Sequence, residues 1–404
     1  MTHKAATAAH AIHKRAVVAI AAATGSTSLL MNVWFPFLPL YLLQVGAKDE
    51  PAALFWVAVG MSAQGVGRLI GGPLWGLLSD RLGRKKMFVR SVYSAALTSF
   101  VLSLINAPWQ VAIALAIQGL LSGFIPAAVA LTSVSVPDAK VRDALNAVSG
   151  AQYLGSAIGP AVGAAMAIAF GYRGAIFSSG LLIAAVATAV IFLVPADTVR
   201  KKERDLTGAA IGLAPFKPTL QFALAILLYF SLFALTTFRS IATPIALKDI
   251  AGASVTEATG LAFALGGIAS ALGVWALSTR IFRRLRLRNI LAATCVLTAL
   301  GHLLLALSDS VWLYVLAFTV ASFLNASMMP ATNTMIALNV SRERRGTAFG
   351  IGSAAQAIAF MVGPMSAAMF ATVSLKAGFV TVSVLFVALA ALVAFAVREP
   401  PAEK

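Results

Sequence analysis

The stretch QGVGRLIGGPLWGLLSDRLGRKK, residues 64–86, carries the pattern that decides the fold of this chain. It begins with an apolar run that contains one charged residue, Arg68, and it ends in a polar turn where Asp80 stands among four basic residues. An apolar run that stops at a basic cluster is typical of a membrane helix that reaches the cytoplasmic surface. The stretch therefore predicts a transmembrane helix followed by a cytoplasmic loop.

The composition of the whole chain indicates a membrane protein. Of its 404 residues, 60% are hydrophobic and 11% are charged, whereas an ordinary soluble domain is about 45–50% apolar and about 25% charged. The net charge of +17 would suggest a nucleic-acid partner in a soluble protein. We expect no such partner, because membrane topology accounts for the basic residues. The single cysteine, Cys295, excludes an intramolecular disulfide.

Apolar runs fill most of the chain, and a run of about 20 residues is enough to span a bilayer. Twelve can be drawn between short polar breaks, at residues 16–45, 54–78, 88–106, 109–136, 144–170, 174–194, 218–247, 257–279, 290–307, 311–339, 347–374 and 378–397. Each must be helical, because lipid offers no partner for a free backbone N–H or C=O group. We therefore predict an all-α membrane protein with twelve transmembrane helices.

The two halves of the chain repeat each other. PAAVALTSV from Pro126 aligns with PATNTMIAL from Pro330, and the same offset pairs the Gly-Pro at 159–160 with the Gly-Pro at 363–364. Two repeated six-helix halves are typical of a transporter that rocks about a site near the bilayer midplane. The predicted domains are an N-terminal tail (1–15), a six-helix bundle (16–194), a central loop (195–217), a second six-helix bundle (218–397) and a C-terminal tail (398–404).

Basic residues predict the orientation of the chain in the membrane. With both termini in the cytoplasm, 25 of the 31 lysines and arginines fall on the cytoplasmic side and four fall on the other side. Only Arg68 and Arg239 lie within spans. We therefore expect a multi-pass protein whose two termini and central loop are all cytoplasmic.

The end of the opening stretch resembles a signature of the major facilitator superfamily. That family has Gly-x-Leu-x-Asp-Arg-x-Gly-Arg-Lys between its second and third spans, and GLLSDRLGRK at residues 76–85 matches it. The resemblance implies two six-helix bundles that give alternating access to a central cavity. It also implies a cytoplasmic gate that includes Gly76, Asp80, Arg81, Gly83 and Arg84.

A second motif resembles the twelve-span drug/metabolite:proton antiporters of the same superfamily. GSAIGPAVGA, which starts at residue 155, is similar to their Gly-x-x-x-Gly-Pro-x-x-Gly-Gly pattern, with Ala164 in place of the last glycine. Glycines four residues apart permit close helix approach. The motif is therefore predicted to form a helix-packing contact and not a substrate site, through Gly155, Gly159, Pro160 and Gly163.

The chain departs from these antiporters where they couple transport to protons. Their fourth span carries an arginine three residues before a Gln-Gly pair, whereas here Leu115 precedes Gln118 and Gly119. None of the 14 acidic residues lies deep in a predicted span. Protons therefore remain a candidate coupling ion, although the sequence shows no evident carboxylate within a span that could carry them. His302, the one histidine within a span, either binds the proton or makes an interhelical hydrogen bond.

The two arginines within spans are candidate substrate-binding residues. At 1.5 Å per residue, Arg68 and Arg239 both fall near the middle of a hydrocarbon core that is about 30 Å thick. A central arginine is unfavourable by about 2.5–3.5 kcal/mol, and neither span offers a nearby acid. Either these arginines face an aqueous cavity and bind an anionic or polar substrate, or they bond polar groups between helices.

Uncharged polar residues within spans complete the predicted substrate site. They are Asn32, Gln64, Gln152, Asn325, Asn333 and Gln356. The resemblance implies that spans 1, 4, 7 and 10 line the cavity, which favours the three asparagines. Gln152 and Gln356 occupy equivalent positions in the two halves and can instead bond across the interface between them.

The resemblance favours secondary active export of drugs or small metabolites across the bacterial cytoplasmic membrane by alternating access. The alternative is a carrier for one anionic substrate, such as an organophosphate, a carboxylate-rich metallophore or a lysolipid, bound by the two arginines. The sequence holds no evident catalytic set, metal-ligand cluster or phosphate loop, so we expect no enzyme activity and no cofactor. We expect a monomer whose partners are a small-molecule substrate and the lipid bilayer.

Overall fold

The computed structural model describes residues 3–137, 140–194, 219–278, 286–340 and 345–398, and for some helix residues it describes the backbone alone. This part of the chain is nearly all helical and contains no strand. Nine helical segments in it are long and apolar enough to cross a membrane. Two of them, Asp143–Leu193 and Leu220–Val274, are long enough for two crossings each. The all-helical membrane fold is confirmed, and the count of twelve spans stays a prediction.

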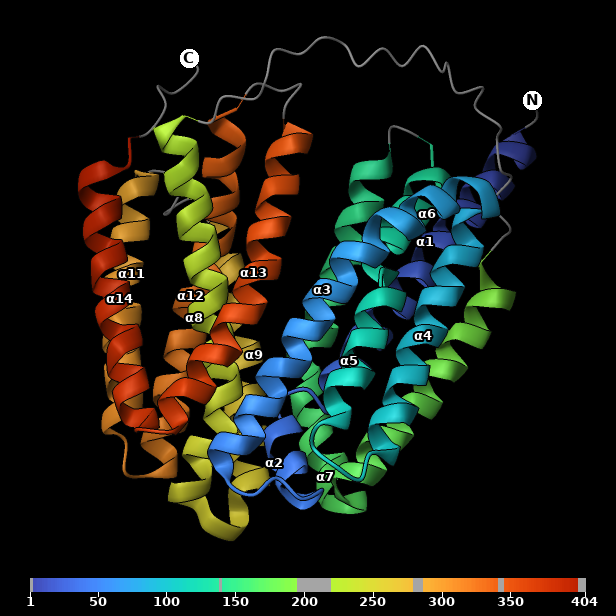
Figure 1. The fold of residues 1–404 in the computed structure, drawn as a ribbon. Coiled ribbons are helices and arrows are strands. Elements are labelled where there is room, and N and C mark those ends of the chain that lie inside the picture. The colour runs from blue at the N-terminus through green and yellow to red at the C-terminus, as the bar shows by residue number, and fades with distance from the viewer. Residues whose placement is uncertain (1–2, 138–139, 195–218, 279–285, 341–344, 399–404) are drawn as a thin grey trace.

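Two bundles of helices make up the molecule (Figure 1). The first contains α1 (His3–Asn32), α2 (Leu38–Gln44), α3 (Glu50–Leu82), α4 (Arg84–Leu104), α5 (Gln110–Leu121), α6 (Phe124–Ser135) and α7 (Val141–Leu193). The second contains α8 (Leu220–Ala251), η2 (Gly252–Ser254), α9 (Val255–Ser278), α11 (Leu287–Leu307), α12 (Val311–Leu338), α13 (Arg345–Ala371) and α14 (Leu375–Ala396). Helix α1 begins inside the predicted N-terminal tail. The predicted central loop lies outside the described residues.

Two of the predicted continuous spans are in fact broken helices. The run 109–136 predicts one span, but α5 ends before residue 122 and α6 starts at residue 124. Gly123 has a φ angle of 120°, which residues with a side chain rarely adopt, and it turns the chain between the two helices. The run 16–45 is likewise divided between α1 and α2 by a turn that contains Pro36, because proline cannot continue a helix's hydrogen bonding.

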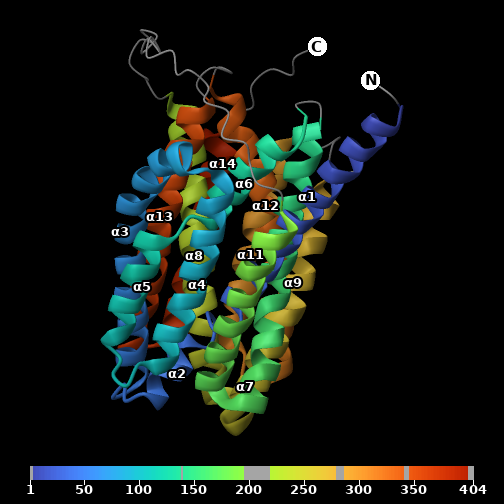
Figure 2. The same ribbon diagram turned by 90° about the vertical axis from the view of Figure 1, so that its right-hand side faces the viewer.

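The two bundles meet at one end of the molecule and separate toward the other (Figure 1). Both termini lie at the end where the bundles separate, as Figure 2 also shows. We call this the termini end and the other the opposite end. Across the region where the bundles meet, α7 packs on α9 and α3 packs on α13. Gly267 of α9 lies against the backbone of Ala157 in α7, and Gly65 of α3 lies against Met361 of α13.

The glycine motif of α7 lies against α1. A Cβ atom on Gly155 or Gly159 would meet a backbone carbonyl oxygen of α1, and one on Gly163 would meet that of Val33 just after α1. Pro160 is buried in the same stretch. The two helices can touch because these positions carry no side chain. The glycines of the motif therefore pack two helices of the same bundle together, whereas Ala157 of the same stretch contacts α9 of the second bundle.

Candidate functional site

Two glutamines join α3 to α5. The Nε2 atom of Gln64 donates a hydrogen bond to the Oε1 atom of Gln118, and the neighbouring Gly119 lies against the backbone of Gln64. Gln118 is buried, and its own Nε2 atom has no hydrogen-bond partner among the described residues. A buried donor that lacks a partner is unfavourable by about 1–3 kcal/mol. This pair therefore leaves one buried amide donor without a partner among the described residues.

Arg68 lies one helical turn from Gln64 on the same side of α3. Its side chain is exposed, and no hydrogen bond or ion pair joins it to another described residue. Gly65, three residues earlier, contacts Met361 of α13. Arg68 is thus one turn nearer to the termini end, where the two bundles separate (Figure 1). We call Gln64, Arg68 and Gln118 the α3–α5 polar group.

Two of the predicted asparagine contacts lie inside the bundles. Asn32 donates from Nδ2 to the Ser28 carbonyl oxygen at 2.8 Å and approaches the Ser156 hydroxyl at 3.4 Å. It thereby belongs to the contact between α1 and α7. Asn325 is buried in α12, and its Nδ2 atom has no partner within the described chain. The structure does not bring either asparagine into contact with the α3–α5 polar group.

The remaining predicted contacts, Asn333, Gln152 and Gln356, are half-buried. Gln152 lies on α7 and Gln356 lies on α13. Their helices pack on different partners, since α7 packs on α9 whereas α13 packs on α3. Bonding of either glutamine across the interface between the halves stays a prediction. Their role in substrate binding stays a prediction.

Arg239 does not face an open cavity in this structure, which corrects the cavity interpretation. Its side chain is buried within the second bundle, and the guanidinium carbon stands 4.7 Å from the centre of the Phe318 ring in α12. Arg239 and Arg68 are alike in sequence, because each is a single arginine in an apolar run without a nearby acid. The packing of α8 against α12 buries one of them, whereas α3 leaves the other at the edge of its bundle.

The predicted gate begins where α3 ends. Gly83 has a φ angle of 97° and separates α3 from α4. Arg84, the first residue of α4, donates from Nη1 to a backbone carbonyl oxygen of α6 at 3.1 Å. For Gly76, Asp80 and Arg81 nothing beyond the helical backbone is described. The gating role of these residues therefore stays a prediction.

Arg90 and Trp75 hold the break between α5 and α6, a role that their sequence context does not reveal. The guanidinium carbon of Arg90 lies 3.7 Å from the centre of the Trp75 ring, and its Nη1 atom donates to the Leu121 carbonyl oxygen at 3.0 Å. The Nε1 atom of Trp75 donates to the Leu120 carbonyl oxygen at 2.7 Å. The last carbonyls of a helix lack partners within it, and a cation near them is favourable. The only sequence signal was a basic residue at the start of a predicted span.

Polar contacts join the two bundles at the opposite end. The Nζ atom of Lys248 in α8 is 2.5 Å from the Oε1 atom of Glu50 in α3. The hydroxyl of Tyr172 in α7 is 2.6 Å from that of Thr256 in α9. The ion-pair side chains are 42% and 28% exposed, and such a pair contributes about 0–1 kcal/mol to stability. These contacts favour closure of the opposite end without locking it.

Charge reversal at Glu50 tests the contribution of this ion pair. Glu50→Lys places two like charges together, so we expect the open population at the opposite end to rise by up to about fivefold. Spin labels at positions 47 and 253 of the reconstituted protein would report it as longer electron paramagnetic resonance distances. Adding Lys248→Glu restores the pair and should restore the distances. An unchanged distance distribution in the single variant would mean that the pair does not hold this end closed.

The α3–α5 polar group can bind a molecule through hydrogen bonds and one positive charge. Arg68 offers a planar fork that suits carboxylate or phosphate oxygens, and Gln118 offers a free amide donor. Acidic residues of the described helices lie only in first or last turns. No group of three or more metal-ligating His, Cys, Asp or Glu side chains occurs among the described residues. The arrangement therefore fits a polar neutral or anionic molecule better than a cation.

Comparison with known proteins gives relatives that match most of the chain. Multidrug resistance protein MdtG of Proteus mirabilis is 30% identical over 345 residues, which is 83% of this chain and 84% of that protein. Multidrug resistance protein MdtG of Salmonella typhimurium is 27% identical over 366 residues, which is 87% of this chain and 88% of that protein. The similarity therefore extends over both bundles.

Solved structures and a family model agree with this similarity. The nucleoside transporter NupG has a TM-score of 0.72 at 16% identity and covers 94% of this chain and 97% of its own. A bacterial homolog of the human lysosomal transporter Spinster, in an inward-facing and occupied conformation, has a TM-score of 0.69 at 14% identity over 95% and 96% of the two chains. The model of the Major Facilitator Superfamily matches residues 20–295 and 225–404. The chain therefore belongs to the major facilitator superfamily.

Proposed function

We propose that this chain is a secondary active exporter of drugs that works by alternating access. The observation that carries the proposal is its similarity to relatives named multidrug resistance proteins, over more than four fifths of the chain. The arrangement of the bundles supports it, because they meet at one end and separate at the other (Figure 1). Such an arrangement suits one end state of a transporter whose halves rock around a central site.

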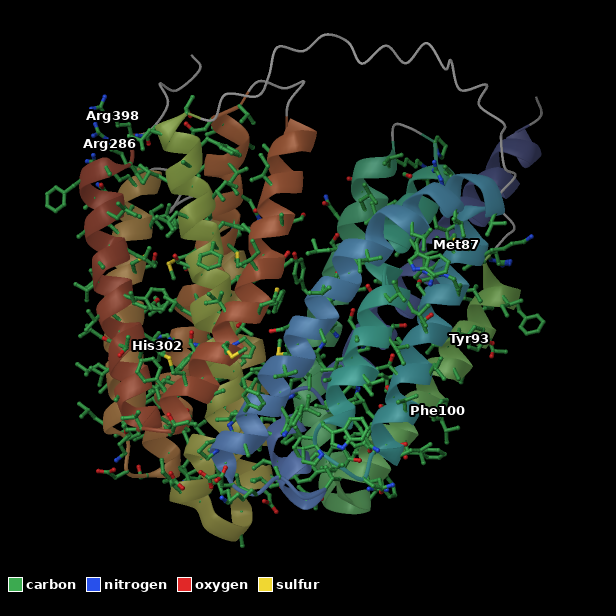
Figure 3. The ribbon with its side chains drawn as sticks, in the orientation of Figure 1. Met87, Tyr93, Phe100, Arg286, His302 and Arg398 are labelled. Carbon is green, nitrogen blue, oxygen red and sulfur yellow. The ribbon has the colours of Figure 1, made fainter. Side chains whose placement is uncertain are left out.

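The termini end faces the cytoplasm in this proposal. Arg286 and Arg398 lie at the termini end of the second bundle (Figure 3), and the basic cluster that follows α3 lies at the same end of the first. Short loops rich in lysine and arginine stay on the cytoplasmic side of a membrane. The structure then corresponds to the inward-open state of a protein in the bacterial cytoplasmic membrane.

The α3–α5 polar group binds the drug in this proposal. Its single charge comes from Arg68, and the acids of the described spans lie only at helix ends, so neutral and anionic drugs should be preferred over cationic ones. The alternative, a carrier dedicated to one anion, has less support. It requires both arginines as ligands, and Arg239 is buried inside the second bundle.

Drug export can be tested in bacteria that lack their own efflux pumps. Cells that express the chain should accumulate several-fold less of neutral and anionic fluorescent drugs than cells with an empty vector. Accumulation of cationic dyes should not change. We propose protons as the driving ion, so a protonophore should abolish the difference. Equal accumulation in both kinds of cell across the whole drug panel would refute export.

A further inference from the structure

A second polar cluster lies inside the second bundle, apart from the α3–α5 polar group. Arg239 of α8, His302 of α11 and Tyr314 of α12 are 4%, 1% and 1% exposed. Helix α12 packs against both α8 and α11, which brings the three residues into one bundle interior. His302 lies in the half of the bundle farther from the termini (Figure 3). Ionisable groups buried within a membrane are unfavourable and usually serve a function.

Arg239 is held in this cluster without an anionic partner. Its guanidinium carbon lies 4.7 Å from the centre of the Phe318 ring, which is a cation–π contact. Its Nε and Nη1 atoms are buried without a hydrogen-bond partner within the described residues. The positive charge is therefore not neutralised by a carboxylate of the described residues. It disfavours a second positive charge in the same bundle interior.

His302 presents a free lone pair in the same interior. Its Nδ1 atom is 2.8 Å from the Thr298 carbonyl oxygen. A carbonyl oxygen only accepts, so Nδ1 must carry the hydrogen and the neutral ring leaves Nε2 as an acceptor. That Nε2 atom is buried, and no described residue donates to it. The ring also packs on Phe386 of α14, with the ring centres 5.1 Å apart. His302 can therefore accept one proton at Nε2 without losing an existing bond.

Few other ionisable groups face His302 from the helices packed around α11. Helix α12 contributes Tyr314, whose hydroxyl pairs with that of Thr243 at 3.1 Å. Helix α14 contributes only Lys376 at its exposed first turn, where it pairs with Asp309. On α11 itself, Cys295 lies two turns away against Met328. The buried cation of the same bundle interior is Arg239 of α8, and α12 packs against both α8 and α11.

We propose that Nε2 of His302 binds the coupling proton and that Arg239 controls its release. This inference rests on the proposed proton-driven export. In the inward-open state the guanidinium charge stands near the imidazole, and like charges repel, so the proton leaves toward the cytoplasm. When a rearrangement within the second bundle separates Arg239 of α8 from His302 of α11, the free lone pair takes a proton from the other side. Only a proton moves, and no covalent bond other than N–H forms or breaks.

Replacement of His302 by glutamine tests the proton site. In proteoliposomes with a trapped pH-sensitive dye, His302→Gln should lower drug-dependent proton movement by about tenfold or more, the scale on which proton-transfer groups act. Drug binding, followed by thermal shift, should stay within about twofold because the drug site lies elsewhere. The matched control is His13→Gln in the N-terminal segment, which should transport like the unsubstituted chain. Undiminished proton movement in a folded His302→Gln variant would overturn the inference, but it would not contradict the proposal that the chain exports drugs.

A direct measurement keeps the inference testable if that variant fails to fold. The chain contains four histidines, so substitution of His3, His10 and His13 by glutamine leaves His302 as the sole histidine. Its ¹⁵N signals in reconstituted protein should show Nε2 changing between the free and the protonated form across a pH titration, with the balance altered by added drug. Arg239→Gln should leave Nε2 protonated over more of the titration and uncouple drug export from the proton gradient. A signal that stays the same at every pH, with and without drug, would refute a proton-binding role.

Discussion

Gly159→Leu is expected to abolish transport, because it forces apart the two most closely packed helices of the first bundle. A Cβ atom at this position would lie 2.7 Å from the Asn32 Cβ atom and would also meet the Leu29 carbonyl oxygen of α1. Overpacking of a tightly packed contact is unfavourable by about 1–3 kcal/mol, and backbone atoms cannot move aside as a flexible side chain can. We expect export to fall by about tenfold or more, and the protein to be less monodisperse on size-exclusion chromatography.

Gly150→Leu is the matched control for this prediction. Gly150 lies on the same helix, α7, and a Cβ atom there would meet nothing within 4 Å. The same increase in side-chain size should therefore leave both protein yield and export close to those of the unsubstituted chain. Equal effects of the two substitutions would show that the loss comes from a leucine anywhere on α7 and not from the contact with α1.

Arg68→Gln is expected to remove most of the export of anionic drugs. The substitution takes away the only charge of the α3–α5 polar group, and a hydrogen bond to a charged group contributes about 1.5–3 kcal/mol. This corresponds to roughly a tenfold to hundredfold loss of affinity. Neutral drugs should lose less, because the amide donor of Gln118 is retained. Concentration-dependent drug uptake into everted membrane vesicles would measure both effects.

Arg68→Lys serves as the comparison variant. Lysine keeps the charge but lacks the planar fork, so anionic drugs should be exported at an intermediate level. Leu69→Gln, at an exposed neighbouring position, should change little. Full activity of Arg68→Gln with anionic drugs would exclude Arg68 as a ligand. It would favour the alternative that Arg68 bonds polar groups between helices.

Local sequence patterns predicted those features that depend only on residues close together in the chain. The turn at Gly83 follows from its signature, and the small residues of α7 follow from their spacing. The pairing of Gln64 with Gln118 and the stacking of Arg90 on Trp75 join residues from different helices. No pattern along the chain specifies which helices become neighbours, so these contacts could not be predicted.

The sequence by itself determined that this chain crosses a membrane as apolar helices in two repeated halves. It could do so because a helix in lipid satisfies its own backbone hydrogen bonds, so its length and composition are sufficient to predict it. The tertiary structure alone decided the positions of the two arginines within spans. Arg68 of α3 is exposed, whereas Arg239 of α8 is buried against Phe318. Their surroundings in sequence are alike, and the difference arises because a side chain's environment depends on the helices packed around it.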